Sequence, residues 1–260
     1  MEQREFHPSF DEYRSILHAI QATGKHCDYK TAKGKDQFII MRHDIEFSID
    51  RAHALSLVES EEGFHSTYFV QLTNNSYNAL SRRNIAMLHD MAQRGHQIGL
   101  HYHLNGQLDP VTVRDGVRDQ LRIMSEMLGM NIDTYSFHRP VKEVYYYDIS
   151  IPNTINAYSK DFFTYAENVT DDTKLDVKYI ADSKHRWNYG YPDYVTLMKY
   201  PKIQILTHPF SWTPVGYDNY ENFISLIDEK HTELIDTLTD EFQRFREVRE
   251  RILNRIESEL

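Results

Sequence analysis

Two kinds of apolar pattern alternate along the chain. Continuous apolar runs are typical of buried strands, and apolar residues spaced three or four apart are typical of amphipathic helices. Helical spacing predicts helices at residues 10–22, 49–62, 84–94 and 111–128, and apolar runs predict strands at 37–41, 65–72, 96–101, 132–137, 177–181 and 203–206. Strands that alternate with helices predict a parallel sheet, and this number of units in one domain favours a barrel over an open sheet.

Two segments depart from this alternation. Residues 145–176 are rich in tyrosine and asparagine and predict a long irregular segment beside the site. Residues 219–260 keep helical spacing, so we expect one long helix or two, which either cap the domain or pair with another subunit. We therefore expect a single domain over residues 1–260, with residues 219–260 as a helical extension.

Composition and charge narrow the range of functions. The formal net charge of −10 argues against a general nucleic-acid or anionic-membrane binder. The N-terminus lacks the apolar stretch of a signal peptide, and no run of about 18 apolar residues is present to span a bilayer, so we expect a cytoplasmic protein. Cys27 is the only cysteine, which excludes an intramolecular disulfide and leaves His, Asp, Glu and Asn as ligands for any metal.

Two strand ends carry candidate metal ligands. Asp44 and Glu46 follow the first predicted strand, and His101 and His103 follow the third. Parallel strands of a barrel deliver functional side chains at their C-terminal ends, and residues two apart in extended backbone point to the same face. Each pair can therefore point into one pocket, and carboxylates together with imidazoles suit a divalent metal such as zinc.

Three further predicted strands also end in polar residues. These residues are His138 with Arg139, then Asp182, then His208. Each of them also has a plain structural interpretation, as a helix cap, an ion pair or a buried hydrogen-bonded side chain. His43 and His96 are each either one residue out of phase with the presumed site residues of their strand or well before them in sequence. We therefore interpret both as structural.

Taken in order, these five strand ends resemble the motifs of the polysaccharide deacetylases, the NodB-homology family also called carbohydrate esterase family 4. The resemblance covers residues 10–212 and rests on the order and spacing of the motifs. It implies a distorted (β/α) barrel that removes N- or O-acetyl groups from sugars. It also implies a divalent metal, usually zinc, that polarises the acyl carbonyl and activates a water.

The resemblance further implies a role for each motif residue. The expected metal ligands are Asp44, Glu46, His101 and His103. The expected substrate-binding residues are His138, Asp182 and Trp187. Asp44 would also be the general base, oriented by a charge-assisted bond from Arg139, and His208 would protonate the leaving amine or alcohol. Asp182 and Trp187 would wall the acetyl pocket or tune the histidine.

Two positions differ from the family pattern. The second acid of the first motif is Glu46, one methylene longer than the usual aspartate. Asn105 stands four residues after His101, where the family has its second ligand histidine. His103 or His138 can take that place. Without either of them, zinc affinity should fall, and the protein would be metal-free or catalyse another reaction.

These observations favour a cytoplasmic, metal-dependent hydrolase. Its substrate would be an acylated sugar, nucleotide-sugar or lipid-linked precursor in surface-polysaccharide synthesis. Two alternatives remain open: an amide hydrolase acting on a small nitrogen compound, and a saccharide-binding protein that kept the barrel and lost turnover. A deacetylase should bind a metal and lose it when His101 is removed, whereas a binding protein need not hold one.

Overall fold

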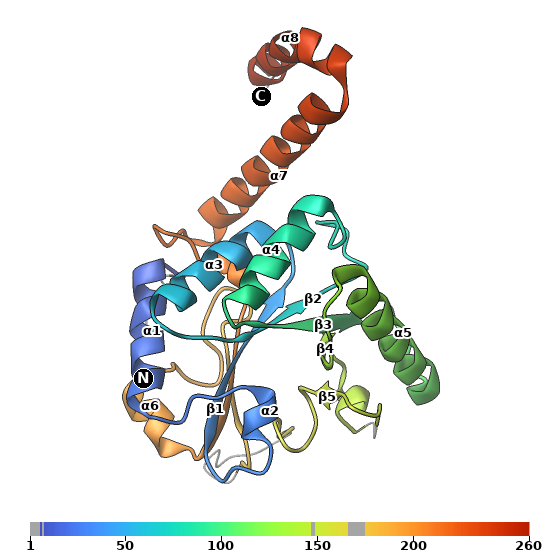
Figure 1. The fold of residues 1–260 in the computed structure, drawn as a ribbon. Helices are drawn as coiled ribbons and strands as arrows, with labels where there is room; N and C mark the ends of the chain where they lie inside the picture. The colour runs from blue at the N-terminus through green and yellow to red at the C-terminus, as the bar shows by residue number, and fades with distance from the viewer. Residues whose placement is uncertain (1–5, 7, 147–148, 166–174, 260) are drawn as a thin grey trace. The chain divides into compact units, whose positions relative to one another are not determined.

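The computed structural model describes residue 6 and residues 8–146, 149–165 and 175–259 of the chain (Figure 1). The chain divides into two compact units, Met1–Tyr217 and Asp218–Leu260. The first unit contains all five polar strand ends, and the second contains the predicted helical extension.

In the described part of the chain, the first unit is built on a parallel sheet of seven strands. They are β1 (Phe38–Ile45), β2 (Thr67–Val70), β3 (Gln97–His103), β4 (Thr134–His138), β5 (Ile155–Asn156), β6 (Lys178–Ala181) and β7 (Lys202–Thr207). Their spatial order is β5-β4-β3-β2-β1-β7-β6, so β1 lies between β2 and β7. The predicted α/β fold with a parallel sheet is confirmed.

The four predicted helices of this unit are present and cover the outside of the sheet (Figure 1). They are α1 (Phe10–Ala22), α3 (Ile49–Glu61), α4 (Arg82–Gln93) and α5 (Pro110–Leu128). Each begins after a serine or aspartate whose side chain accepts a hydrogen bond from a backbone N–H three residues on, which satisfies one of the free amides of the first turn. The short helices α2 (Tyr29–Ala32) and α6 (Tyr194–Lys199) were not predicted.

Side chains of β1 alternate between two environments. Ile39 and Met41 pack in an outer cluster with α1, α3 and α6. Phe38 and Ile40 belong to an inner cluster that also takes residues from β2 and from the segments beside β5 and β6. Because this inner cluster joins both ends of the sheet, the sheet curls around it as a half-barrel, with β5 and β6 at its two edges.

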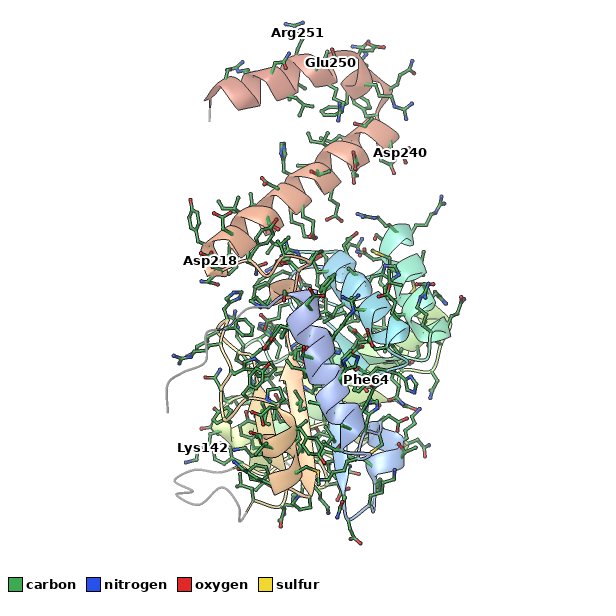
Figure 2. The ribbon with its side chains drawn as sticks, turned by 90° about the vertical axis from the view of Figure 1, so that its left-hand side faces the viewer. Phe64, Lys142, Asp218, Asp240, Glu250 and Arg251 are labelled. Atoms are coloured by element: carbon green, nitrogen blue, oxygen red, sulfur yellow. The ribbon has the colours of Figure 1, made fainter. Side chains whose placement is uncertain are left out.

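The second unit is a pair of helices, α7 (Asn219–Glu241) and α8 (Gln243–Glu259). Asp218 caps α7, and Figure 2 shows it at the start of that helix. Leu226 and Ile235 of α7 are buried, whereas Ile227 and Leu234 are 63% and 56% exposed. Among the described residues, no helix combines the length and the apolar character needed to cross a membrane.

Candidate metal and catalytic site

The strand ends on the inner face of the sheet bring together four of the predicted site residues. Asp44 lies at the end of β1 and Glu46 directly after that strand, while His101 lies in β3 and His138 ends β4. Even-numbered residues of β1 face the inner cluster, so Asp44 points to the same side as that cluster. The C-terminal ends of three strands therefore supply one constellation.

The donor atoms of this constellation have the spacing of metal ligands. Glu46, His101 and His138 each offer one ligand atom within 4.8 Å of the others. Nδ1 of His138 lies 3.2 Å from Nε2 of His101 and 3.5 Å from Oε1 of Glu46. Donors placed tetrahedrally around zinc at bond lengths of about 2.0–2.1 Å are about 3.3–3.4 Å apart. We call Glu46, His101 and His138 the metal triad.

The protonation states of the triad also suit a metal. Burial lowers the pKa of His101 to about 3 and that of His138 to about 4, so both imidazoles are neutral at pH 7 and each has a nitrogen lone pair. The Nδ1 atom of His101 lies 2.8 Å from Oγ of Ser136, which leaves Nε2 facing the triad. Burial raises the pKa of Glu46, and the charges of His208 and Arg139 offset this only in part.

Asp44 is held by a buried arginine that sequence reasoning missed. Nη2 of Arg42 donates to Oδ2 of Asp44 at 2.7 Å and to the hydroxyl of Tyr158 at 3.0 Å. Nη1 of Arg42 donates to Oε1 of Gln204 at 3.0 Å. Burial alone would raise the pKa of Asp44, but the Arg42 charge, aided by nearby histidines, keeps it below its usual value. Asp44 is therefore ionised at pH 7.

One oxygen of Asp44 is left open. Oδ1 is buried and has no hydrogen-bond partner among the described residues, although Oδ2 is bonded to Arg42. Nε2 of His101 lies 3.6 Å from Oδ2, so the carboxylate borders the metal triad. A buried carboxylate oxygen without a partner is costly unless it binds a ligand, a proton or a water.

No hydrogen bond between Arg139 and Asp44 is present among the described residues. Among the described residues, the guanidinium that bonds Asp44 belongs to Arg42. Arg139 is exposed and lines a cavity of about 380 Å³ together with Glu46 and His138. The orienting role of Arg139 stays a prediction, and Arg42 makes the bond that was expected of it.

His103 also lines this cavity. Nδ1 of His103 accepts a hydrogen bond from the backbone N–H of Asn105 at 2.9 Å, and its ring lies 4.8 Å from that of His138. His138, which we predicted as a substrate-binding residue or as a substitute for the second histidine ligand, stands within the triad. The ligand role of His103 stays a prediction.

His208 and Asp182, which end neighbouring strands, are bonded to each other, and their site roles stay predictions. Nδ1 of His208 lies 2.6 Å from Oδ1 of Asp182, and the backbone N–H of His208 donates to both carboxylate oxygens. Burial alone would lower the pKa of His208, but Asp182 outweighs it and raises the pKa to about 9. Nε1 of Trp212 donates to Oδ2 of Asp182 at 2.9 Å, which fixes the carboxylate. His208 is therefore charged at pH 7 and holds a proton to donate.

Trp187 packs against the outer cluster that contains Ile39 and Met41. Its ring packs edge-on against Phe6 and Tyr191 and at a tilt against Trp212. Trp212 in turn donates a hydrogen bond to Asp182, so Trp187 contacts a residue that holds the Asp182–His208 pair. Its predicted place in the wall of the acetyl pocket stays a prediction.

A second cluster of histidines and a carboxylate lies on the outer face of β1. Glu59 of α3 accepts hydrogen bonds from the hydroxyls of Tyr13, Ser66 and Tyr68 at 2.6–2.7 Å. Nε2 of His43 lies 3.0 Å from Glu59, and Nδ1 of His96 lies 3.4 Å from it. We call these six residues the Glu59 network: Tyr13, His43, Glu59, Ser66, Tyr68 and His96. His43 and His96 thus lie in a structural network, as their phase predicts.

No protein-family model matches the sequence, and no curated protein is significantly similar to it. Solved structures do match. Several are carbohydrate esterases of family 4. These structures bear the name of the family that the five motifs resemble, and all of them are below 15% identity and below a TM-score of 0.5 to this chain.

Three examples show the range of the matches. A Streptococcus mutans CE4 esterase is 13% identical with a TM-score of 0.43, and the alignment covers 85% of this chain and 90% of that one. The Streptococcus pyogenes deacetylase PplD in complex with acetate is 14% identical with a TM-score of 0.41, over 52% and 65% of the two chains. BA3943, a CE4 family pseudoenzyme from Bacillus anthracis, is 12% identical with a TM-score of 0.44, over 77% and 62%. This chain thus spans less than two thirds of the last two.

Proposed function

We propose that this protein is a metal-dependent hydrolase that removes an acyl group, acetyl first of all, from a saccharide or saccharide precursor. The observation that carries the proposal is the metal triad, in which three donor atoms from three strand ends lie within 4.8 Å of one another. Two of the separations, 3.2 Å and 3.5 Å, are close to those of tetrahedral zinc ligands. The neutral imidazoles and the open oxygen of Asp44 support it. A divalent ion held there would polarise the acyl carbonyl.

The residues of this chain divide the proton transfers between them. Ionised Asp44 accepts a proton from the attacking water, and Arg42 keeps the carboxylate charged and fixed for that step. Protonated His208 donates to the leaving amine or alcohol, and Asp182 holds its ring in place through Nδ1. Asp44 is thus ionised and His208 protonated at pH 7, which are the starting states of a general base and a general acid.

The first test is the metal content of the full chain purified without a metal-binding tag. Elemental mass spectrometry should find close to one divalent ion per chain in the wild type and much less in His101→Ala. Added zinc should raise the melting temperature of the wild type more than that of His101→Ala, because a ligand that binds only the folded state stabilises it. The absence of metal after reconstitution, with no zinc-dependent stabilisation, would contradict the proposal.

Turnover distinguishes the proposed enzyme from the two alternatives. Acetate release from acetylated chito-oligosaccharides, or from a nucleotide-linked N-acetyl sugar, would support a deacetylase. Metal binding with saccharide binding and no acetate release would favour the binding protein instead. Release of ammonia or an amine from small amides alone would favour the small-amide hydrolase.

The proposal includes a cytoplasmic location and a role in the synthesis of surface polysaccharide. It also includes self-association through α7, because Ile227 and Leu234 leave a large apolar area exposed on that helix. Light scattering on the full chain should then give a mass above that of one chain, and Ile227→Lys should lower it. A monomeric wild type would contradict self-association without affecting the proposed chemistry.

A further inference from the structure

Arg139 is a cation that lines the cavity beside the metal triad. Its side chain is exposed and makes no hydrogen bond or ion pair with any residue that the structure describes. Glu46 and His138 line the same cavity, so Arg139 stands next to two members of the triad. Its charge partly offsets the effect of burial on the pKa of Glu46, and the bond that orients Asp44 comes from Arg42.

The backbone shows that this position is constrained. Arg139 has φ 46° and Asn105 has φ 50°, both in the left-handed region that side chains other than glycine rarely adopt. These two residues follow β3 and β4, which pair in register up to His103 and His138, and both line the cavity. Such a conformation costs about 1–3 kcal/mol and persists mainly at functional sites. Asparagine adopts this conformation readily, so the cost that the chain bears lies at Arg139.

Apart from the aromatic ring of Phe47, the rest of the cavity lining is neutral and polar. The loop after β2 contributes Gln71, Thr73, Asn74, Asn75 and Ser76, all of which line it. Amide and hydroxyl groups of this kind suit the hydroxyl groups of a sugar. Glu46 is the sole carboxylate among the described lining residues, and it belongs to the metal triad.

We propose that Arg139 binds an oxyanion carried by the substrate, a phosphate or a carboxylate attached to the saccharide. This inference rests on the proposed function for the saccharide and names its class more closely: a sugar phosphate, a nucleotide-sugar or a sugar acid. The planar guanidinium presents paired N–H donors that match the oxygens of a phosphate or carboxylate. The polar loop after β2 then contacts the sugar, while the triad faces the acyl group.

Binding to the full chain, freed of metal by a chelator and kept at low ionic strength, tests this assignment. Isothermal titration calorimetry would compare four probes: N-acetylglucosamine, N-acetylglucosamine 1-phosphate, glucuronic acid and inorganic phosphate. At least one of the two anionic sugars should bind about tenfold or more tightly than neutral N-acetylglucosamine, as a hydrogen bond to a charged group predicts. The two anionic sugars tell phosphate from carboxylate.

Variants at Arg139 complete the test. Arg139→Gln should abolish the preference for the anionic sugar while leaving the affinity for N-acetylglucosamine within about twofold, and Arg139→Lys should keep part of the preference. Arg122→Gln is the matched control, because Arg122 is an exposed arginine that bonds Glu126 on α5, and it should change neither affinity.

Three results would overturn the assignment. In the first, the wild type binds neither anionic sugar more tightly than N-acetylglucosamine. In the second, Arg139→Gln keeps the preference for the anionic sugar, and in the third, inorganic phosphate binds as tightly as the sugar phosphate. Because the measurement uses metal-free protein and no turnover, its failure differs from that of the proposed function. Loss of the hydrolase proposal would appear as missing metal or missing acetate release.

Discussion

The two faces of β1 carry two clusters of the same chemical kind with opposite properties. The metal triad combines one glutamate and two histidines, and so does the centre of the Glu59 network. Every residue of the Glu59 network is closed off from solvent, and Glu59 accepts bonds from three hydroxyls and lies against two imidazoles. The triad borders a cavity and an unpartnered oxygen of Asp44.

The difference shows what separates a site from a structural polar cluster. Burial alone would raise the pKa of Glu59, but His43 above all, with His96 and the Ser66 hydroxyl, lowers it to about 2. Glu46 has none of these donors, and burial raises its pKa. Composition alone does not distinguish the two clusters. Donor atoms without partners, together with access from a cavity, mark the one that can bind a ligand.

The largest expected effect comes from removing the centre of the Glu59 network. Glu59→Ala should lower the free energy of unfolding by about 3–5 kcal/mol, because it leaves buried hydroxyls and imidazoles without their acceptor. Urea denaturation at pH 7 measures the change. Glu62→Ala, which removes a partly exposed partner of His18, should cost about 1 kcal/mol or less. If Glu59→Ala also lowers the metal content per folded chain, the two clusters are not independent of each other.

Acid should lower the stability of the protein through Glu59, on the outer face of β1. The pKa of Glu59 in the folded protein, about 2, is below its ordinary value of 4.5. Its contribution to stability is therefore present above pH 4.5 and is lost as the pH falls toward 2, by roughly 3 kcal/mol in all. Glu59→Gln should flatten the fall of stability between these pH values. If the free energy of unfolding falls equally steeply with pH in the wild type and in Glu59→Gln, Glu59 is not the titrating group.

Metal affinity should distinguish the histidines on the inner face. His138→Ala removes a triad donor and should weaken zinc binding by more than about 100-fold, the upper range for losing only a hydrogen bond to a ligand. His103→Ala should change it by less than about tenfold, since His103 already accepts from Asn105. Competition with a chromophoric chelator measures both. The reverse order would assign the second histidine ligand to His103.

A pair of buried serines gives the smallest and most closely matched test. Ser66 bonds Glu59, and Ser136 lies 2.8 Å from His101. Ser66→Ala should lower the free energy of unfolding by about 1 kcal/mol and leave zinc affinity unchanged. Ser136→Ala should weaken zinc binding about tenfold, because it frees the ring that holds a triad donor. Similar effects of the two changes on both quantities would contradict the comparison.

Local patterns predicted the long helices and the main strands, because each buries one regular stripe of apolar residues. Helix α5 and strand β1 lie where the pattern placed them, within a few residues. The helices α2 and α6 escaped detection because four and six residues are too few to show a helical period. Strand β5, two residues long, falls in the segment expected to be irregular.

The sequence also pointed to the strand ends that meet at the site. It could not rank His103 against His138, since both lie at strand ends and the choice depends on distances across strands that spacing along the chain does not contain. Arg42 was missed because it directly follows the apolar run at 37–41, and only the acidic residues beyond it were assigned roles. The signal was available: a charged residue two positions before Asp44 shares its face, and a buried charge needs a partner.

The bond between Arg42 and Gln204 has a consequence for how the molecule assembles. These residues are 162 positions apart, and Gln204 also donates to the backbone carbonyls of Ala157 and Phe162. The cation that neutralises Asp44 is thus fixed only after β7 has docked beside β1, late in synthesis from the ribosome. Closing so long a loop is an entropically costly and slow step. A nascent chain lacking β7 would therefore carry the motif residues without a formed catalytic centre.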